Sequence, residues 1–112
     1  AVAGEPCSQG LRDDIILRLK KLGAVNPHVN NRFGFTEIST VLVECDEKGE
    51  GGFHNPAPDH FFLEVVNPET GKQIEDGQPG NLAVTHLNRR GTVLLRYLTG
   101  DIVILSHEIC PF

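Results

Sequence analysis

A single segment of helical periodicity, residues 9–22, is followed to the end of the chain by short apolar runs. Within this segment apolar residues recur every three or four positions with charged residues between them, which predicts one amphipathic helix. Ser8 can cap its N-terminus, Gly23 ends it, and Pro27 prevents the helix from continuing. The apolar residues of the expected helix are Leu11, Ile15, Ile16, Leu19 and Leu22.

The later apolar runs are short, rich in β-branched residues and separated by turn signals, so they predict strands. A polar, glycine-rich loop at residues 47–52 divides the chain. We therefore expect an α+β fold. It would comprise a strand–helix–strand piece of an α/β subdomain at residues 1–52 and an antiparallel β-barrel-like subdomain at residues 53–112, both partial. The expected strands are 40–45, 61–66, 81–86, 92–97 and 102–105, with a turn at 67–71.

Charge and hydropathy exclude two classes of protein. The 112 residues carry a formal net charge of −5 and their basic residues form no run longer than a pair, so the charge pattern of a nucleic-acid binder is missing. No apolar run approaches the roughly 18–20 residues that span a bilayer, so we expect a cytoplasmic protein without a membrane partner. The chain starts without methionine and ends on Cys110, Pro111 and Phe112, and we interpret it as an internal part of a longer polypeptide.

Three short segments carry residue types that a nucleotide site uses. Segment 32–37 offers an aromatic wall for a base, a glycine for close backbone approach, a hydroxyl for a phosphate oxygen and a carboxylate for Mg²⁺. Segment 96–101 places a carboxylate after a Thr-Gly turn, which suits two ribose hydroxyls. Segment 4–6 precedes the expected helix. Each also has an ordinary interpretation: a strand end with a solvated glutamate, a capped β-turn, and a turn before a helix.

Together and in this order, these segments resemble the adenylate-forming superfamily of acyl- and aryl-CoA ligases. Residues 80–87 and 94–101 are similar to the family's G-E-L-V-x-T-x-L … L-I-R-Y-x-T-G-D stretch, and residues 59–71 resemble the D-H-F-x-x-E-V … D-P-E-T-G run of phenylacetate-CoA ligases. The resemblance covers essentially the whole chain. It departs at Phe33, where tyrosine is commoner, and at Asn81, where glutamate is usual and the asparagine is interpreted as structural.

The resemblance implies a role for each matching residue. Thr36 would contact the α-phosphate and Glu37 would hold Mg²⁺, which makes these two the candidate catalytic residues. Asp101 would bind the ribose hydroxyls, and Phe35 would face the substrate that carries the carboxylate. The implied AMP-binding set is Gly4, Glu5 and Pro6 along the adenine pocket, Phe33 and Gly34 over the base, and Phe35, Thr36, Tyr97 and Asp101.

The implied activity is activation of an aryl or acyl carboxylate by ATP and Mg²⁺ as acyl-AMP, followed by transfer to coenzyme A. The family's phosphate loop and catalytic lysine match nothing in this chain, so alone it is expected to be inactive. Two alternatives stay open: a synthetase of the same fold that passes the acyl group to a protein thiol, and a non-enzymatic β-rich binding module. Uncovered helix and strand surfaces predict self-association, and a homodimer stays open for the full enzyme.

Three residues could also ligate a metal. Cys45 ends an expected strand, His54 follows the glycine-rich loop, and Cys110 lies near the end of the chain. Thiolates and an imidazole suit tetrahedral structural Zn²⁺. The alternative is that Cys45 is a small apolar strand residue and that His54 and Cys110 are unrelated to it.

Overall fold

The computed structural model describes residues 1–4, 6–45 and 52–110, which form one helix, a short 3-10 helix and two sheets. The expected α+β class is therefore confirmed. The chain divides into two compact units, Ala1–Pro56 and Ala57–Pro111, and each is described separately below. Most of loop 47–52 lies outside the described residues, so a subdomain boundary at that loop stays a prediction. Among the described residues, no helix has the length and apolar character needed to cross a membrane.

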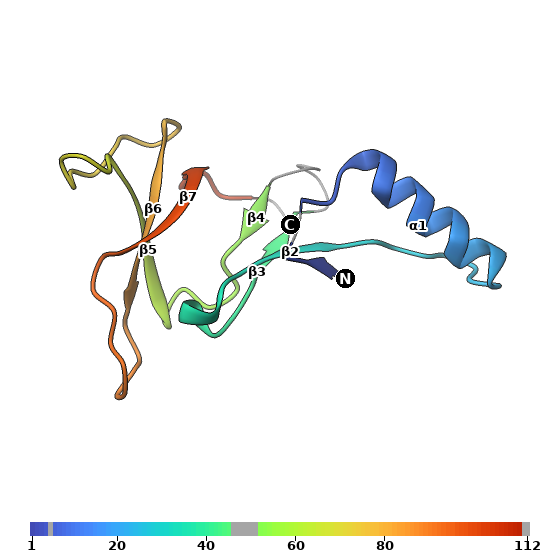
Figure 1. Cartoon of the computed structure of the whole chain (residues 1–112), viewed down its shortest axis with the longest axis horizontal. Coiled ribbons are helices and arrows are strands. Elements are labelled where there is room, and N and C mark those ends of the chain that lie inside the picture. Colours follow the sequence, from blue (N-terminus) through green and yellow to red (C-terminus); the bar gives the residue numbers. More distant parts are fainter. Residues whose placement is uncertain (5, 46–51, 111–112) are drawn as a thin grey trace. The chain divides into compact units, whose positions relative to one another are not determined.

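The first unit is a four-stranded sheet with strand order β1-β2-β3-β4 (Figure 1). Strands β1 and β2 are parallel and the helix α1 lies between them in the chain, which is the expected strand–helix–strand piece. Strands β2, β3 and β4 pair antiparallel. The elements are β1 (Val2–Ala3), α1 (Gln9–Lys21), β2 (Asn31–Phe33), the 3-10 helix η1 (Thr36–Ile38), β3 (Leu42–Glu44) and β4 (Phe53–His54).

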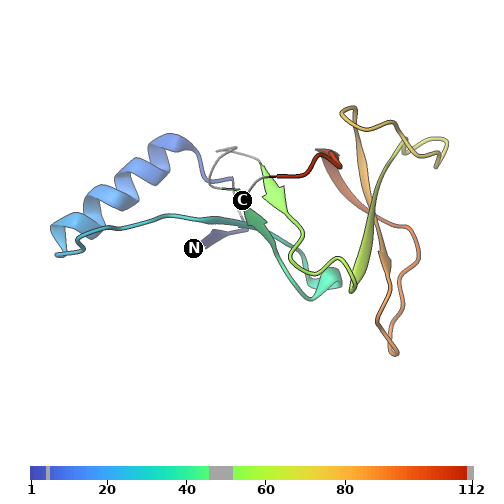
Figure 2. The same ribbon diagram turned by 180° about the vertical axis from the view of Figure 1, so that it is seen from behind.

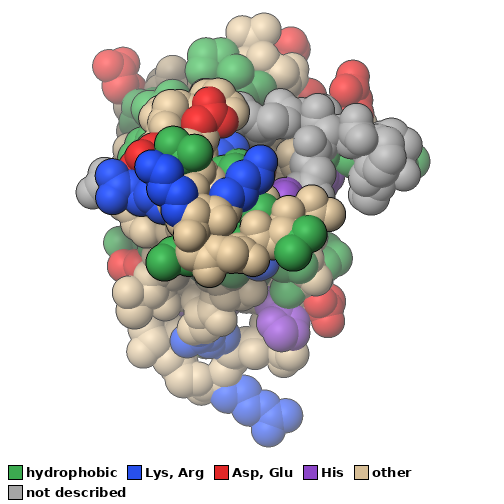
Figure 3. Space-filling view, turned by 90° about the vertical axis from the view of Figure 1, so that its right-hand side faces the viewer, with side chains coloured by type: hydrophobic (Ala, Val, Ile, Leu, Met, Phe, Trp, Pro, Cys, Tyr) green, Lys and Arg blue, Asp and Glu red, His purple; other side chains and the backbone are tan. Residues whose placement is uncertain are grey.

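Helix α1 begins and ends where its sequence predicts. The Ser8 side chain accepts a hydrogen bond from the Leu11 N–H, and Gly23, just beyond the helix, has a φ of 95°. None of the residues of α1, all of which the structure describes, is buried. Figure 3, which views the side of the molecule where α1 lies, shows hydrophobic and basic side chains exposed together. The helix therefore keeps much of its apolar surface uncovered within this unit.

An ion pair whose side chains have little exposure to solvent connects α1 to the sheet. Arg12 Nη2 lies 2.7 Å from Glu44 Oε1, and the side chains are only 14% and 5% exposed. The Asn31 N–H donates to Glu44 Oε2 at 2.8 Å, and Arg12 donates a second hydrogen bond to the same oxygen at 3.1 Å. Burial alone raises the pKa of Glu44, but the hydrogen bonds from Arg12 and Asn31 and the positive charges of Arg12 and His28 outweigh it, so the pKa is lowered.

The lowered pKa of Glu44 predicts a loss of stability in acid. The pair's contribution is complete above the usual glutamate pKa of 4.5 and is lost as pH falls through the lower pKa of the folded state. We expect the midpoint of urea unfolding of the first unit to fall over this range. A Glu44→Gln variant, measured by circular dichroism at each pH, should be less stable at pH 7 and lose less on acidification. An identical pH dependence in both proteins would contradict the assignment.

The second unit is a meander of three antiparallel strands, β5-β6-β7 (Figure 2). These are β5 (Phe61–Val66), β6 (Pro79–His86) and β7 (Tyr97–Ile104). The expected turn between β5 and β6 is present: Asn67 Oδ1 accepts hydrogen bonds from the N–H groups of Glu69 and Thr70. The buried apolar residues of this unit are Phe61, Val65, Val66, Leu82, Ala83 and Val84.

The predicted strand at 92–97 is wrong, whereas the predicted strand at 102–105 is present as the end of a longer strand. Residues 92–96 lie outside any strand, and one strand, β7, runs through the Thr-Gly-Asp segment that was expected to be a turn. Gly100 has a φ of 88°, and the pairing with β6 shifts between Asn81 and Ala83. A β-bulge accommodates the left-handed conformation of Gly100 without ending the strand. A Thr-Gly signal in the sequence is compatible with either a bulge or a turn.

Candidate nucleotide-binding and metal sites

The parallel pair β1–β2 brings two of the expected nucleotide-binding segments to one edge of the first sheet. Val2 pairs with Asn31 and Ala3 pairs with Arg32, so Gly4, which follows β1, and Phe33, the last residue of β2, lie at the same, carboxyl end. In open α/β sheets ligands bind at the carboxyl ends of the strands. Glu5 lies outside the described residues, and Pro6 is exposed.

Phe33 belongs to an aromatic cluster at this edge. Its ring centroid lies 6.1 Å from that of Phe35, edge to face, and 5.9 Å from that of Phe53. Phe33 and Phe35 are both half-buried, which leaves part of each ring accessible. An aromatic face of this kind can stack on a planar base, with or without the hydroxyl of a tyrosine.

Gly34 has a packing reason to be glycine, separate from any ligand. A Cβ on Gly34 would lie 2.8 Å from Val41 Cγ1 and 3.0 Å from the Thr40 carbonyl oxygen. Any other residue would require the Val41 side chain to move and the backbone at Thr40 to give slightly. The close approach expected at this position is therefore to the protein's own chain, and it fixes the path of the segment that leads to Thr36 and Glu37.

Thr36 and Glu37 open the short helix η1 immediately after the aromatic cluster. Thr36 is exposed and Glu37 is half-buried, while Ile38 beneath them is buried and anchors the turn. Ser39 ends η1 in a left-handed conformation with a φ of 55°. The turn places a hydroxyl and a carboxylate on adjacent residues, and the carboxylate oxygen is a ligand type that Mg²⁺ accepts.

Asp101 and Tyr97 lie on β7 in the second unit. The Asp101 N–H donates to Thr99 Oγ1 at 3.1 Å, and the Gly100 N–H donates to Asn81 Oδ1 at 3.3 Å. These bonds fix the bulge that carries Asp101, whose side chain is partly exposed. Asn81 therefore has a structural contact at the position where the resembling family usually has glutamate.

Arg96 was not singled out from the sequence, yet it holds the start of β7. Its φ is 48°, an uncommon left-handed conformation for a residue with a side chain. Its N–H donates to Thr85 Oγ1 at 2.9 Å, and its guanidinium contacts Glu64 Oε2 at 3.3 Å and the Gly71 carbonyl at 2.8 Å. The only signal for Arg96 in the sequence was its position next to Tyr97 in segment 96–101, which resembles the ligase family.

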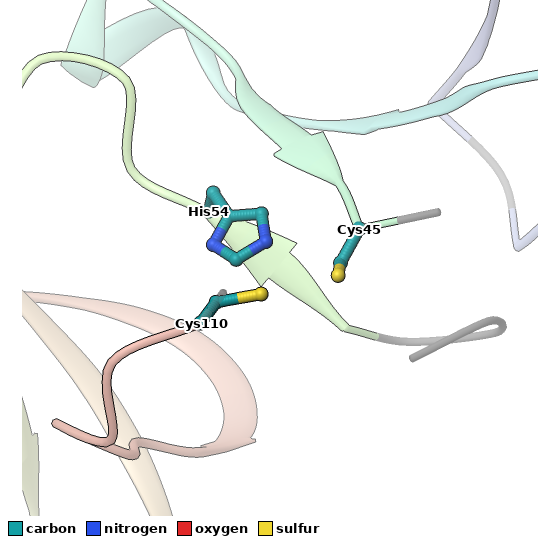
Figure 4. A group of neighbouring side chains, drawn as sticks. All are labelled: Cys45, His54 and Cys110. Atoms are coloured by element: carbon teal, nitrogen blue, oxygen red, sulfur yellow. The ribbon is translucent and has the colours of Figure 1, made fainter. Parts of the chain in front are cut away.

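The candidate metal ligands of the first unit are Cys45, just after β3, and His54, in the neighbouring strand β4. His54 is paired with Val43 in β3, and Cys45 directly follows that strand, with its N–H donating to the Gly52 carbonyl at 2.7 Å. The Cys45 sulfur and a His54 ring nitrogen lie within 4.8 Å of each other (Figure 4). Cys45 is 3% exposed, and within the described part of the chain His54 Nε2 is buried without a hydrogen-bond partner. Cys110 belongs to the second unit and is partly exposed.

The orphaned His54 nitrogen is the observation that fits a metal. A buried ring nitrogen without a partner costs free energy, and a cation bound to it would remove that cost. A thiolate and an imidazole on adjacent strands are two of the ligand types of tetrahedral zinc sites. The pair is therefore chemically suited to Zn²⁺.

Comparison with known proteins gives a consistent set of relatives. The chain is 35% identical to a phenylacetate-coenzyme A ligase of Thermus thermophilus over 98% of its own length, and 32% identical to that of Escherichia coli over 90%. It spans 24% of the first relative and 22% of the second, about a quarter of their length. No protein-family model matches the chain.

Solved structures agree with the sequence relatives. A 2-hydroxyisobutyryl-CoA ligase, in an open conformation with 2-HIB-AMP and CoA, aligns with 95% of the chain at a TM-score of 0.70 and 24% identity, which shows a shared fold. The same ligase in a postadenylation state with R3-HIB-AMP aligns with 88% of the chain at a TM-score of 0.64 and 25% identity. The chain covers 24% and 20% of these two structures. Nearly the whole chain is thus similar to part of phenylacetate-coenzyme A ligases and shares the fold of the corresponding part of an acyl-CoA ligase.

Proposed function

We propose that the chain is part of an ATP-dependent acid–CoA ligase and carries residues of its nucleotide site. The observation that carries this proposal is the identity of 35% with a phenylacetate-coenzyme A ligase over nearly the whole chain. That similarity includes the segments at residues 32–37 and 96–101. The carboxyl edge of β1 and β2, where Gly4 and Phe33 lie, supports the proposal because ligands bind at such edges.

In the first unit, the proposed roles are those that the resemblance to acyl-CoA ligases implies. Gly4, Glu5 and Pro6 line the adenine pocket, and the half-buried rings of the aromatic cluster cover the base. Thr36, which is exposed, would contact the α-phosphate with its hydroxyl, and Glu37 would hold Mg²⁺, which would offset phosphate charge. Phe35 faces the acid substrate.

In the second unit, Asp101 is proposed to accept hydrogen bonds from two ribose hydroxyls, with Tyr97 nearby. A carboxylate has two oxygens and can accept both bonds at once. The bulge fixed by Asn81 and Thr99 holds the Asp101 backbone in one conformation, which lowers the entropy lost on binding.

The proposed reaction joins a carboxylate to the α-phosphate of ATP with release of pyrophosphate, and then transfers the acyl group from the acyl-AMP to a thiol with release of AMP. In-line attack of the carboxylate oxygen on the α-phosphorus requires that the negative charge of the phosphate be offset. Thr36 would contribute a hydrogen bond from its hydroxyl, and Glu37 would hold the Mg²⁺ ion that supplies positive charge. The names of the relatives favour coenzyme A over a protein thiol as acceptor, and an aromatic acid over other acids. The cytoplasm, where ATP and coenzyme A are available, is the proposed location.

Substrate and acceptor are tested together in the longer polypeptide that contains this chain. Acyl-CoA formation is measured with phenylacetate, 2-hydroxyisobutyrate and acetate, each with either coenzyme A or a phosphopantetheine-bearing carrier protein. We expect phenylacetyl-CoA as the main product. Transfer only to the carrier protein would reassign the acceptor, and no adenylation of any acid would reject the proposed activity.

A structural Zn²⁺ ion is a second proposal, supported by the orphaned His54 Nε2 beside Cys45. We propose Cys45 and His54 as two of its ligands, and Cys110, which belongs to the second unit, stays a prediction from the sequence. Zinc content should be about one ion per chain, and Cys45→Ala should reduce it at least tenfold because a thiolate ligand is lost. Cys7→Ala is the matched control, since Cys7 is also a buried free cysteine of the first unit. Equal zinc content in both variants would reject the site.

Self-association is proposed for the isolated chain, through α1 more than through the second unit. Leu11 and Leu22 are 43% and 85% exposed, and burying such a side chain contributes about 1.5–3 kcal/mol. We expect Leu11→Gln/Leu22→Gln to shift the sedimentation distribution at micromolar concentration toward monomer. Leu95→Gln, at a 74% exposed position of the second unit, should shift it less. A monomeric parent chain would contradict this prediction.

A further inference from the structure

His86 closes the connection between β6 and β7 with both its backbone and its side chain. The His86 N–H donates to the Leu94 carbonyl at 2.9 Å, and the Leu94 N–H donates back to His86 Nδ1 at 3.2 Å. His86 is buried at 7% exposure, while the residues it encloses, 87–93, are exposed. The side chain thus completes a two-bond clasp at the base of an otherwise solvated loop.

The direction of the second bond fixes the state of the imidazole. A backbone N–H can only donate, so His86 Nδ1 must accept and must carry no proton. The clasped form therefore requires the neutral tautomer that is protonated at Nε2. A second proton at Nδ1 would convert the acceptor into a donor facing another donor, and the bond from Leu94 would be lost.

The clasp lies two residues before the strained start of β7. After Leu94, the left-handed Arg96 is held by Thr85, and Tyr97 then pairs with Val84. Three consecutive residues of β6 thus hold the chain as it enters β7. Of Val84, Thr85 and His86, only His86 is titratable, and it is the one next to the solvated loop at 87–93.

We propose that neutral His86 is a positioning residue for the start of β7, the strand that carries Tyr97 and Asp101. Protonation of the imidazole opens the clasp and loosens the entry into this strand. The positioning of Asp101 for ribose binding rests on the proposed function. The clasp itself rests only on the contacts of His86 with Leu94.

Charged residues occur in the segments that adjoin His86 in the chain and across the sheet. Its cross-strand partner in β5, Phe61, follows His60, whose carbonyl accepts from the Leu87 N–H. Positive charges in the connection oppose a further positive charge on the imidazole, whereas carboxylates favour it. The titratable groups on the elements around His86 are Asp59, His60, Glu64, Arg89, Arg90 and Arg96.

Two substitutions distinguish the role of His86 as a hydrogen-bond acceptor from its ability to be protonated. His86→Asn can place an amide oxygen near the position of Nδ1 and cannot be protonated in this range. His86→Leu fills the buried space and offers no acceptor. His107→Asn, which alters an exposed histidine paired with Asp76 in the same unit, is the control for a general effect of losing a histidine.

The readout is the hydrogen-exchange protection factor of the Leu94 amide in the chain itself, measured by NMR at pH 8 and pH 5, without nucleotide. In the parent chain and in His107→Asn we expect protection to fall about fivefold to tenfold at pH 5, the factor that corresponds to one net hydrogen bond. His86→Asn should keep protection at both pH values, and His86→Leu should lack it at both. Protection that is independent of pH in the parent chain, or loss in His86→Asn equal to that in His86→Leu, would overturn the proposal.

The functional consequence is measured separately in the longer ligase. The KM for ATP should rise about fivefold or more between pH 8 and pH 5 in the parent enzyme relative to His86→Asn. Matching pH profiles of the two enzymes, together with the expected Leu94 protection, would overturn the link to nucleotide binding and leave the clasp in place. Absence of ATP binding in every variant would instead reject the proposed function.

Discussion

Replacement of Glu44 by alanine is expected to lower the free energy of unfolding of the first unit by about 3–5 kcal/mol. The substitution leaves the Arg12 guanidinium, 14% exposed, without its carboxylate and the Asn31 N–H without its acceptor. An uncompensated buried charge costs more than the lost attraction alone. Urea unfolding of the chain, followed by the helical signal of α1 in circular dichroism, measures the change.

The exposed pair Asp14–Arg18 on the same helix is the matched control. Its side chains are 48% and 74% exposed, so Asp14→Ala should cost no more than about 0.5 kcal/mol. The double variant Arg12→Met/Glu44→Leu should recover most of the stability, because apolar side chains of similar volume can replace a buried pair. Equal, small losses in Glu44→Ala and Asp14→Ala would show that α1 is not fastened to the sheet through Glu44.

Local signals in the sequence were sufficient for the elements that local interactions determine. Helix α1 lies at Gln9–Lys21 because its cap at Ser8 and its periodicity are both short-range features. Strand β5 occupies Phe61–Val66, as its apolar run predicts. These elements need no information about distant parts of the chain.

Features that depend on distant partners could not be predicted in the same way. The bulge in β7 depends on the bond between Gly100 and Asn81, nineteen positions apart. Glu44 looked like an ordinary strand residue, because its partner Arg12 lies on a helix 32 positions away. A sequence pattern reports periodicity and turn chemistry, but it does not report such pairings.

The candidate site shows the same division. Residue types in segment 32–37 suggested a nucleotide site, and the resemblance supplied their roles. The parallel register that brings Gly4 beside the end of β2 required the structure. The packing of Gly34 against Val41 also required it, and this contact gives the glycine a structural reason that its motif does not reveal.

Replacement of Asp101 by alanine is expected to weaken ATP binding by the longer ligase about 30-fold or more. Two charge-assisted hydrogen bonds to the ribose would be lost, at a cost of roughly 2–4 kcal/mol. Isothermal titration with ATP measures the change. Asn81→Ala should weaken binding less, because Asn81 is proposed to act through the Gly100 backbone and not on the nucleotide.

A second carboxylate of the same unit provides the control for Asp101. Asp76 is exposed and pairs with His107 at 2.7 Å, and this bond holds its pKa below the usual value. Removing Asp76 changes the net charge of the unit by the same amount as removing Asp101. Asp76→Ala should therefore leave ATP affinity within about twofold of the parent, and a loss equal to that of Asp101→Ala would reject a specific ribose contact.

The central claim is that this chain supplies nucleotide-binding residues to an adenylating ligase. Its most direct test is acid-dependent exchange of labelled pyrophosphate into ATP by the longer polypeptide, without coenzyme A. We predict exchange that requires phenylacetate and Mg²⁺, persists in Asp76→Ala, and falls at least 30-fold at subsaturating ATP in Asp101→Ala. Undiminished exchange in Asp101→Ala, or no exchange in the parent protein with any carboxylic acid, would contradict the claim.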